Sequence, residues 1–146
     1  AIWFDPRTWQ GGEARRWVID LSPTVPLDLR LDAGNGAATA ALDGLTLTSL
    51  TIDSGNGAVA ATLPDGDYDV RVDSGNGSVA LSLPEGIEAR VEYDSGNGRV
   101  GGPQRFERVR GGRDEGVYET PGYDETAGGI TIRLDSGNGS VTISER

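Results

Sequence analysis

The sequence predicts an all-β, single-domain β-solenoid of about five coils, with roughly 20–21 residues per coil and an N-terminal Trp-rich cap. Three observations support this prediction. The motif Asp-Ser/Ala-Gly-Asn-Gly occurs five times, its copies begin 21, 20, 21 and 41 residues apart, and alternating apolar residues flank each copy. A near-constant period places equivalent residues in columns, so that identical turns can stack.

The elements are expected in a simple order along one domain, residues 1–146. Residues 1–26 carry Trp3, Trp9 and Trp17 and are expected to cap the first coil. Solenoid coils follow over 27–100, a loop excursion over 101–128, and the last coil over 129–146.

Each coil is expected to contain two strands. Around the third motif copy, Tyr68, Val70 and Val72 alternate with polar residues, and Val79, Leu81 and Leu83 do the same after the turn. Alternation with a period of two indicates a strand with one buried face. An antiparallel meander of hairpins also fits, since Asn-Gly is a strong hairpin signal. The constant period favours the solenoid.

The 41-residue gap before the last motif allows either a copy that has lost its motif or an inserted excursion. Stacking in sequence order would place Arg71 opposite Glu92 and Asp69 opposite Arg90, which gives favourable cross-strand pairs. Glu92 would also match Arg133 if strand 129–135 lay directly on strand 88–94, and this favours an excursion. The excursion, with its aromatic residues, is expected to fold over the final coil or to pack beside it, and so to cover the exposed edge.

The composition excludes several chemistries. The chain has 13 Arg, 23 acidic residues and a net charge of −10, and it lacks Lys, His, Cys and Met. A thiol nucleophile, an imidazole base, a P-loop and a Cys-based zinc site are therefore excluded. The negative charge argues against a nucleic-acid partner. No catalytic residue, cofactor or metal is expected.

The motif itself defines two columns of turn residues. Each Asp is expected to accept hydrogen bonds from its own turn, with Ca²⁺ between coils as the alternative. The turn glycines are expected to hold a positive φ, and the stacked Asn amides can form a ladder. These structural turn columns are Asp32, Asp53, Asp73, Asp94, Asp135 and Asn35, Asn56, Asn76, Asn97, Asn138.

Two further groups are candidates for binding. The outer face of the second strands is small and nearly uncharged, which is compatible either with close strand packing or with a contact face. The possible contact face consists of Thr39, Ala41, Ala60, Thr62, Ser78, Ala80 and Ser82. The excursion contains an arginine cluster that is either solvated or a possible anion contact: Arg105, Arg108, Arg110 and Arg113.

The runs "VPLDLRLDAGNG", "LPDGDYDVRVDSGNGSV", "LPEGIEARVEYDSGNG" and "GVYETPGYDE…ITIRLDSGNGSVTI" resemble the bacterial toast-rack domain. This adhesin-like repeat is found in cell-wall-active-antibiotic-response and envelope-stress proteins. The resemblance covers roughly residues 15–144. It implies a β-solenoid without known enzymatic activity or catalytic residues, which lies next to membrane segments in envelope sensing or adhesion.

We therefore expect a non-enzymatic, structural interaction module of the bacterial cell envelope, extracytoplasmic or at the cell surface. Its expected partner is a protein or a second copy of itself, and a membrane is expected only through segments absent from this chain. One alternative is a self-assembling, fibre-forming structural protein. A minor alternative is an Asp/Arg carbohydrate-active enzyme.

Overall fold

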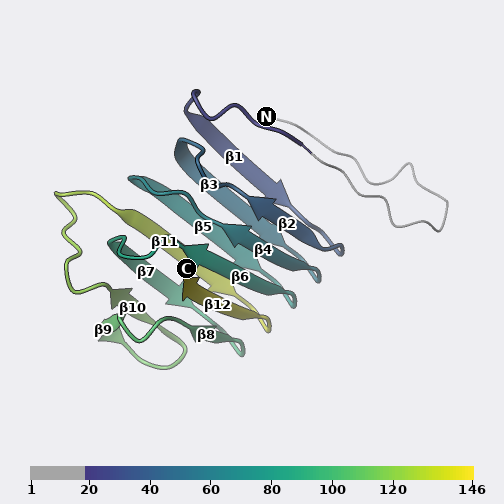
Figure 1. Cartoon of the computed structure of the whole chain (residues 1–146). Helices are drawn as coiled ribbons and strands as arrows, with labels where there is room; N and C mark the ends of the chain where they lie inside the picture. Colours follow the sequence, from purple (N-terminus) through teal and green to yellow (C-terminus); the bar gives the residue numbers. More distant parts are fainter. Residues whose placement is uncertain (1–18) are drawn as a thin grey trace.

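The computed structural model describes residues 19–146 and contains only strands as regular secondary structure in that range, which confirms the all-β prediction (Figure 1). The twelve strands are β1 (Leu27–Asp32), β2 (Ala38–Ala41), β3 (Leu47–Ser54), β4 (Ala58–Thr62), β5 (Tyr68–Ser74), β6 (Ser78–Leu83), β7 (Ala89–Asp94), β8 (Arg99–Gly101), β9 (Glu107–Gly111), β10 (Glu115–Glu119), β11 (Ile130–Ser136) and β12 (Ser140–Glu145).

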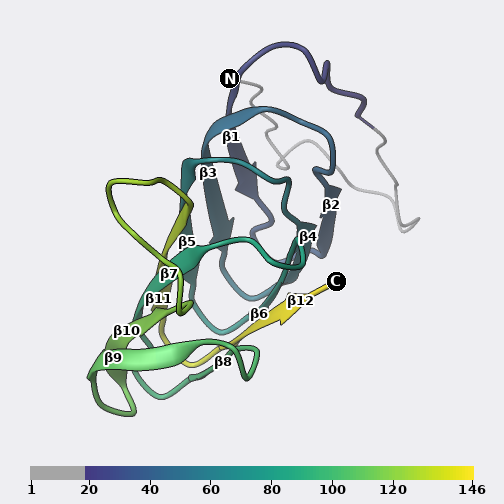
Figure 2. The same ribbon diagram turned by 60° about the vertical axis from the view of Figure 1, so that its left-hand side comes forward.

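The strands form two sheets that face each other (Figure 2). Sheet A has the order β1-β3-β5-β11-β7-β10-β9, and sheet B has the order β2-β4-β6-β12-β8. All neighbours pair in parallel except β7 with β10 and β10 with β9. Because strands of different repeats pair in parallel, the antiparallel meander is wrong for the part of the chain that the structure describes.

The core lies between the two sheets. In β5, buried and exposed residues alternate strictly, as the sequence pattern predicts. Each sheet contributes its inward residues, and the fully buried ones are mainly Leu, Ile and Val. They include Leu50, Ile52, Val70, Val72, Val91 and Ile132 from sheet A, and Val79, Leu81 and Val141 from sheet B.

The strand pair β11–β12 lies inside the stack, although it is the last in sequence. It is inserted between the pairs β5–β6 and β7–β8 in both sheets. Arg71 therefore lies opposite Arg133, and Asp69 opposite Thr131. The expected opposition of Arg71 to Glu92 and of Asp69 to Arg90 is wrong, because β11 separates these strands.

The neighbouring position of Glu92 and Arg133 is confirmed. The two residues are register partners on β7 and β11, and Arg133 Nε lies 3.4 Å from a Glu92 carboxylate oxygen. The charge match therefore located one neighbour of the last strand pair correctly. It gave no information on the other neighbour, β5.

The excursion contributes a hairpin, β9–β10, to the end of sheet A. Strand β10 pairs antiparallel with the outer edge of β7, and Phe106 before the hairpin is buried in the core cluster. The Tyr118 ring stacks on Tyr93, with 5.2 Å between ring centroids. The excursion thus covers an edge as expected. That edge belongs to β7 and not to the C-terminal strand pair, because β11–β12 is internal.

The expected Trp-rich cap concerns Trp3, Trp9 and Trp17, which lie outside the described residues. Residues 19–26 lead into β1, and the Thr46 hydroxyl donates a hydrogen bond to the Pro23 carbonyl at 3.3 Å. No helix in the range 19–146 is long and apolar enough to cross a membrane.

Candidate functional site

The asparagines of the five turns form a continuous ladder along one edge of the molecule. Each side-chain amide donates to the carbonyl oxygen of the next, in the order of the stack and not of the sequence. The donor–acceptor distances are 2.8 Å from Asn56 to Asn35, 2.9 Å from Asn76 to Asn56, 2.9 Å from Asn138 to Asn76 and 3.1 Å from Asn97 to Asn138. The ladder fixes the spacing of the turns without using a charged group.

The motif serines face inward and are buried. The hydroxyls of Ser54, Ser74 and Ser136 donate to the carbonyls of Gly57, Gly77 and Gly139 at 2.7, 2.9 and 2.8 Å. Sequence reasoning missed this role. The available signal was the replacement of Ser by Ala33 only in the first copy, where the stack begins.

The turn glycines are required mainly by close stacking. Only Gly34 and Gly96, in the first and fourth motif copies, have a positive φ within the motif. Gly77 does not, which corrects the expectation for this residue. A Cβ atom on Gly77 would lie 1.8 Å from the Gly57 carbonyl oxygen. The turn backbones therefore approach too closely for any side chain.

The motif aspartates form an outward row across sheet A. Asp32, Asp53, Asp73, Asp135 and Asp94 are successive register partners, and Glu115 of β10 extends the row next to Asp94.

Turn capping, the role expected for these aspartates, occurs only at the outer copies. Asp32 accepts from the Gly34 amide at 3.0 Å and Asp94 from the Gly96 amide at 3.4 Å. Asp53 instead lies 3.4 Å from Arg30. Residues 19–146 contain no group of three or more acidic side chains that could hold a metal ion.

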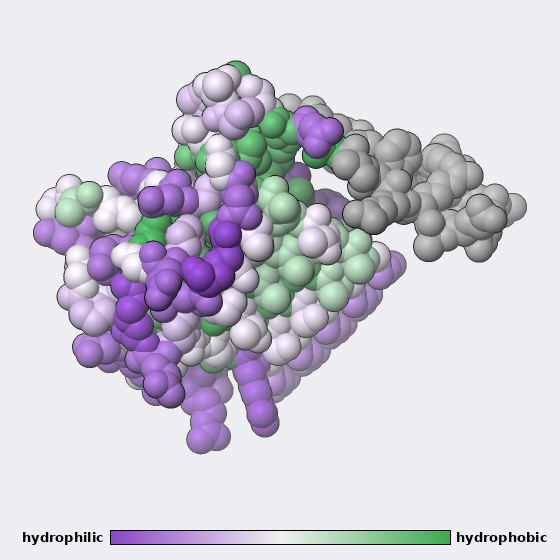
Figure 3. Space-filling model, viewed as in Figure 1, coloured by the Kyte–Doolittle hydropathy of each residue, from purple (hydrophilic) through white to green (hydrophobic). Residues whose placement is uncertain are grey.

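The expected contact face lies on the outer side of sheet B. In register, Thr39 neighbours Ala60, Ala60 neighbours Ala80, and Ala80 neighbours Thr142. In Figure 3, residues of intermediate to slightly hydrophobic character, pale green to white, gather over β2, β4 and β6. Strongly hydrophilic residues, in purple, gather over the excursion. Sequence reasoning omitted Thr142 and Ser144, which extend the same face because β12 lies next to β6. We call this surface, from Thr39 to Ser144, the small-residue face.

The arginine cluster of the excursion does not remain together. Arg105 is half-buried, lies 2.6 Å from Glu145 and also donates to the Ile87 carbonyl. Arg108 lies over the Tyr118 ring, 5.4 Å from its centroid, and donates to its hydroxyl at 2.9 Å. Arg110 and Arg113 are exposed. The first two arginines therefore hold the excursion in place, and only the last two remain available.

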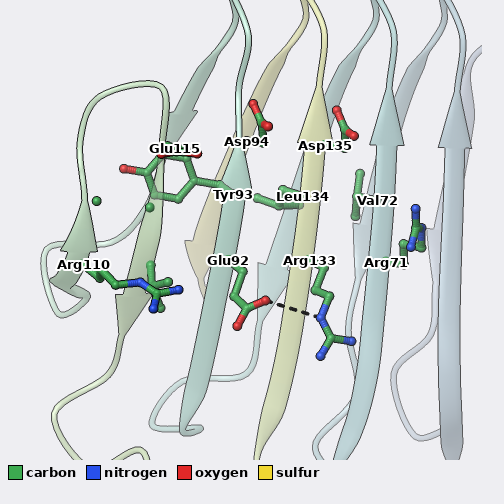
Figure 4. A pocket seen from close by; sticks show the side chains of 13 residues that line it. Arg71, Val72, Glu92, Tyr93, Asp94, Arg110, Glu115, Arg133, Leu134 and Asp135 are labelled. Atoms are coloured by element: carbon green, nitrogen blue, oxygen red, sulfur yellow. Dashed lines mark ion pairs between the residues drawn. The ribbon is translucent and has the colours of Figure 1, made fainter.

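A groove of about 610 Å³ lies between the hairpin and the outer face of sheet A (Figure 4). One row of its lining contains Arg110, Glu92, Arg133 and Arg71, and a second row contains acidic residues. Glu92 pairs with Arg133, whereas no acidic side chain of the described residues lies within ion-pair distance of Arg71. Sequence reasoning missed this groove, because its residues meet only through the inserted position of β11.

Two tyrosines, Tyr68 and Tyr93, have a raised pKa and act as hydrogen-bond donors. Burial, followed by the nearby Asp65 carboxylate, raises the pKa of Tyr68 well above its usual range. The Tyr68 hydroxyl donates to the Pro64 carbonyl at 2.7 Å. Burial and a hydrogen bond with Tyr118 raise the pKa of Tyr93, whose hydroxyl donates to the Gly112 carbonyl at 2.6 Å. Both side chains serve the architecture as hydrogen-bond donors.

Two facing, mainly parallel sheets joined by stacked, repeated turns place this chain among proteins built from stacked β repeats. The comparison with known families identifies the family within that class. The chain belongs to the toast-rack family. The model of the N-terminal domain of toast-rack proteins (DUF2154) matches residues 5–82, more than half of the chain.

A solved structure of a proposed cell adhesion protein from Clostridium sporogenes has a similar fold. The TM-score is 0.73 at 22% sequence identity, over 86% of this chain. The match spans 58% of that longer chain. No curated protein matches this sequence significantly.

Proposed function

We propose that this chain is a non-enzymatic interaction module of the bacterial cell envelope or cell surface, and that the small-residue face is its contact surface. The observation that carries the proposal is the contrast between its two outer faces. Sheet A presents rows of Asp, Glu and Arg, whereas the small-residue face presents only Ala, Ser and Thr in register.

A flat face of small side chains suits contact with another surface. A partner can approach the sheet closely, and little charge must be removed from water when it does. Ser and Thr hydroxyls on the same face, such as Ser78 and Thr142, are exposed and can donate to a polar partner. Most protein surfaces carry more charge than this one.

Membership in the toast-rack family supports the envelope location. The description of the Clostridium sporogenes protein as a proposed cell adhesion protein supports a surface role. We also interpret the five strand pairs as about five coils of one β-solenoid, because each pair contributes one strand to each sheet.

The test is binding of the purified chain to envelope material from the encoding bacterium. Ala80→Arg places a long charged side chain at the centre of the small-residue face, and we expect at least tenfold weaker co-sedimentation. Thr51→Arg introduces the same residue on the outer face of sheet A and should bind like the parent. Equal binding by both variants, with unchanged circular dichroism, would argue against this contact face.

The fibre-forming alternative rests on a separate observation. Strand β9 pairs only with β10, and β8 only with β12, so each has one unpaired edge among the described strands. Multi-angle light scattering distinguishes the two functions. A mass that grows with concentration favours fibres, and a constant mass favours the interaction module.

The minor alternative, a carbohydrate-active enzyme, would use the groove of sheet A. Its carboxylates Asp94, Glu115 and Asp135 are exposed. Neighbouring carboxylates line the groove, so release of reducing sugar from polysaccharides by the purified chain would favour this alternative, and no release would count against it.

A further inference from the structure

We propose that the β11–β12 pair is exchangeable between two copies of this chain, and that the slot between β5–β6 and β7–β8 binds the β11–β12 pair of a second copy. The proposed partner is therefore a second copy, joined by a domain swap. This inference is independent of the envelope function and rests on three features of the fold.

The slot is a complete binding site for one strand pair. Strand β11 pairs with β5 from Ile130 to Ser136 and with β7 from Ile130 to Asp135, and β12 pairs with β6 and β8. The inserted pair buries five apolar side chains, Ile130, Ile132, Leu134, Val141 and Ile143. These contacts are the same whether the pair comes from its own chain or from another.

The connection to the inserted pair is long enough for exchange. Residues 120–129 join β10 to β11, and most of them are exposed. Fully extended, ten residues span about 33 Å. The segment ends in Gly128 and Gly129, with φ of 89° and 142°, which can change backbone direction without a side-chain clash. Its contacts include a Tyr123–Thr131 hydroxyl pair at 3.2 Å.

Withdrawal of the pair need not leave the slot open. The β5–β6 and β7–β8 pairs follow each other in sequence and carry the same turn motif, so they can close on each other in the repeat register. Closure would place Arg71 opposite Glu92 and Asp69 opposite Arg90. In the inserted form Arg71 faces Arg133, a like-charge pair. The withdrawn form loses the Arg133–Glu92 pair but gains the Arg71–Glu92 and Asp69–Arg90 pairs and relieves the Arg71–Arg133 opposition, and this lowers the cost of exchange.

A disulfide experiment tests the exchange, because the chain contains no native Cys. Asp73 and Asp135 are register partners, at a strand spacing of ~4.8 Å that suits a disulfide. Asp73→Cys and Asp135→Cys chains are mixed as folded proteins at high concentration and then oxidised. We expect a heterodimer linked between positions 73 and 135, formed over hours.

The matched control mixes Asp53→Cys with Asp135→Cys chains. Asp53 occupies the same row but is separated from Asp135 by β5, at roughly 9.6 Å, too far for a disulfide. The double variant Asp73→Cys/Asp135→Cys should form its disulfide within one chain. Equal heterodimer in both mixtures, or none in the first while the double variant closes, would overturn the exchange.

A further variant tests the closing step. Arg71→Glu creates an opposite-charge pair with Arg133 in the inserted form and a like-charge pair with Glu92 in the closed form. In the Asp73→Cys background it should slow heterodimer formation several-fold. An unchanged or faster rate would overturn the role given to slot closure.

Discussion

At the residue scale, the turns depend both on glycines, which have no side chain, and on buried serine hydroxyls. Gly57, Gly77 and Gly139 stack with their backbones in near contact, and the hydroxyls of Ser54, Ser74 and Ser136 each donate to one of these buried glycine carbonyls. No buried side-chain nitrogen or oxygen in the described residues lacks a hydrogen-bond partner. A substitution of a turn glycine therefore disturbs packing, whereas a substitution of a motif serine removes a hydrogen bond.

Gly77→Ala tests the packing requirement. The new methyl group would lie 1.8 Å from the Gly57 carbonyl oxygen, so the stacked turns must move apart. We expect the free energy of unfolding in urea to fall by about 3 kcal/mol. Gly102→Ala is the matched control, because its Cβ meets nothing within 4 Å, and it should change stability by less than ~0.5 kcal/mol. Similar losses in both variants would contradict the close-stacking explanation.

Ser74→Ala tests the buried hydroxyl. The substitution removes the 2.9 Å donor to the Gly77 carbonyl and leaves that carbonyl without this partner. We expect a loss of about 1–3 kcal/mol in the free energy of unfolding. Ser78→Ala, four residues later on the exposed face of β6, should be nearly neutral. The explanation fails if thermal melts show the two variants to be equally stable.

At the element scale, the strands were predictable from the sequence but their order was not. Alternating apolar residues identify β5 and β6, and the five motifs identify the turns. The order was hidden because every repeat offers nearly the same edge, so that β5 can accept either β7 or β11. Charge favours the wrong neighbour for β5, because Arg71 matches Glu92 of β7 but faces Arg133 of β11 in the structure. The groove of sheet A could not be predicted for the same reason.

Phe106→Ala tests the excursion as a cover for the end of the stack. Phe106 is 9% exposed and packs in the core cluster ahead of β9. We expect a loss of about 3 kcal/mol in a urea melt, with increased aggregation as the edge of β7 loosens. Val109→Ala lies on β9 and is 54% exposed, so it should have little effect. A neutral Phe106→Ala would show that the excursion does not stabilise this end.

At the scale of the whole molecule, charge is unevenly distributed between the two sheets. The net charge of −10 includes six carboxylates in register across sheet A, from Asp32 to Glu115, while the small-residue face has none. Like charges directly opposite each other on neighbouring strands are destabilising. The molecule therefore presents a strained, charged face and a neutral one.

Salt and a charge-removing substitution test this asymmetry together. Raising NaCl from about 0.05 to 0.5 M shortens the Debye length and screens the acidic row, so the melting temperature should rise. Asp73→Asn, in the middle of the row, should raise the melting temperature at low salt and reduce its dependence on salt. Asp20→Asn makes the same charge change outside the sheets. If it has the same effect, the row has no special role.

The inserted position of β12 also determines how the domain responds to tension. A pull on Arg146 along the strand loads the hydrogen bonds to β6 and to β8 simultaneously, in shear. A strand at the end of the stack would be held by hydrogen bonds on one side only. The Arg146 backbone and side chain add further bonds, to the Leu83 carbonyl at 3.1 Å and the Leu63 carbonyl at 2.9 Å. The C-terminal strand is therefore a mechanical anchor within the stack, and force applied there is shared by both halves of the molecule.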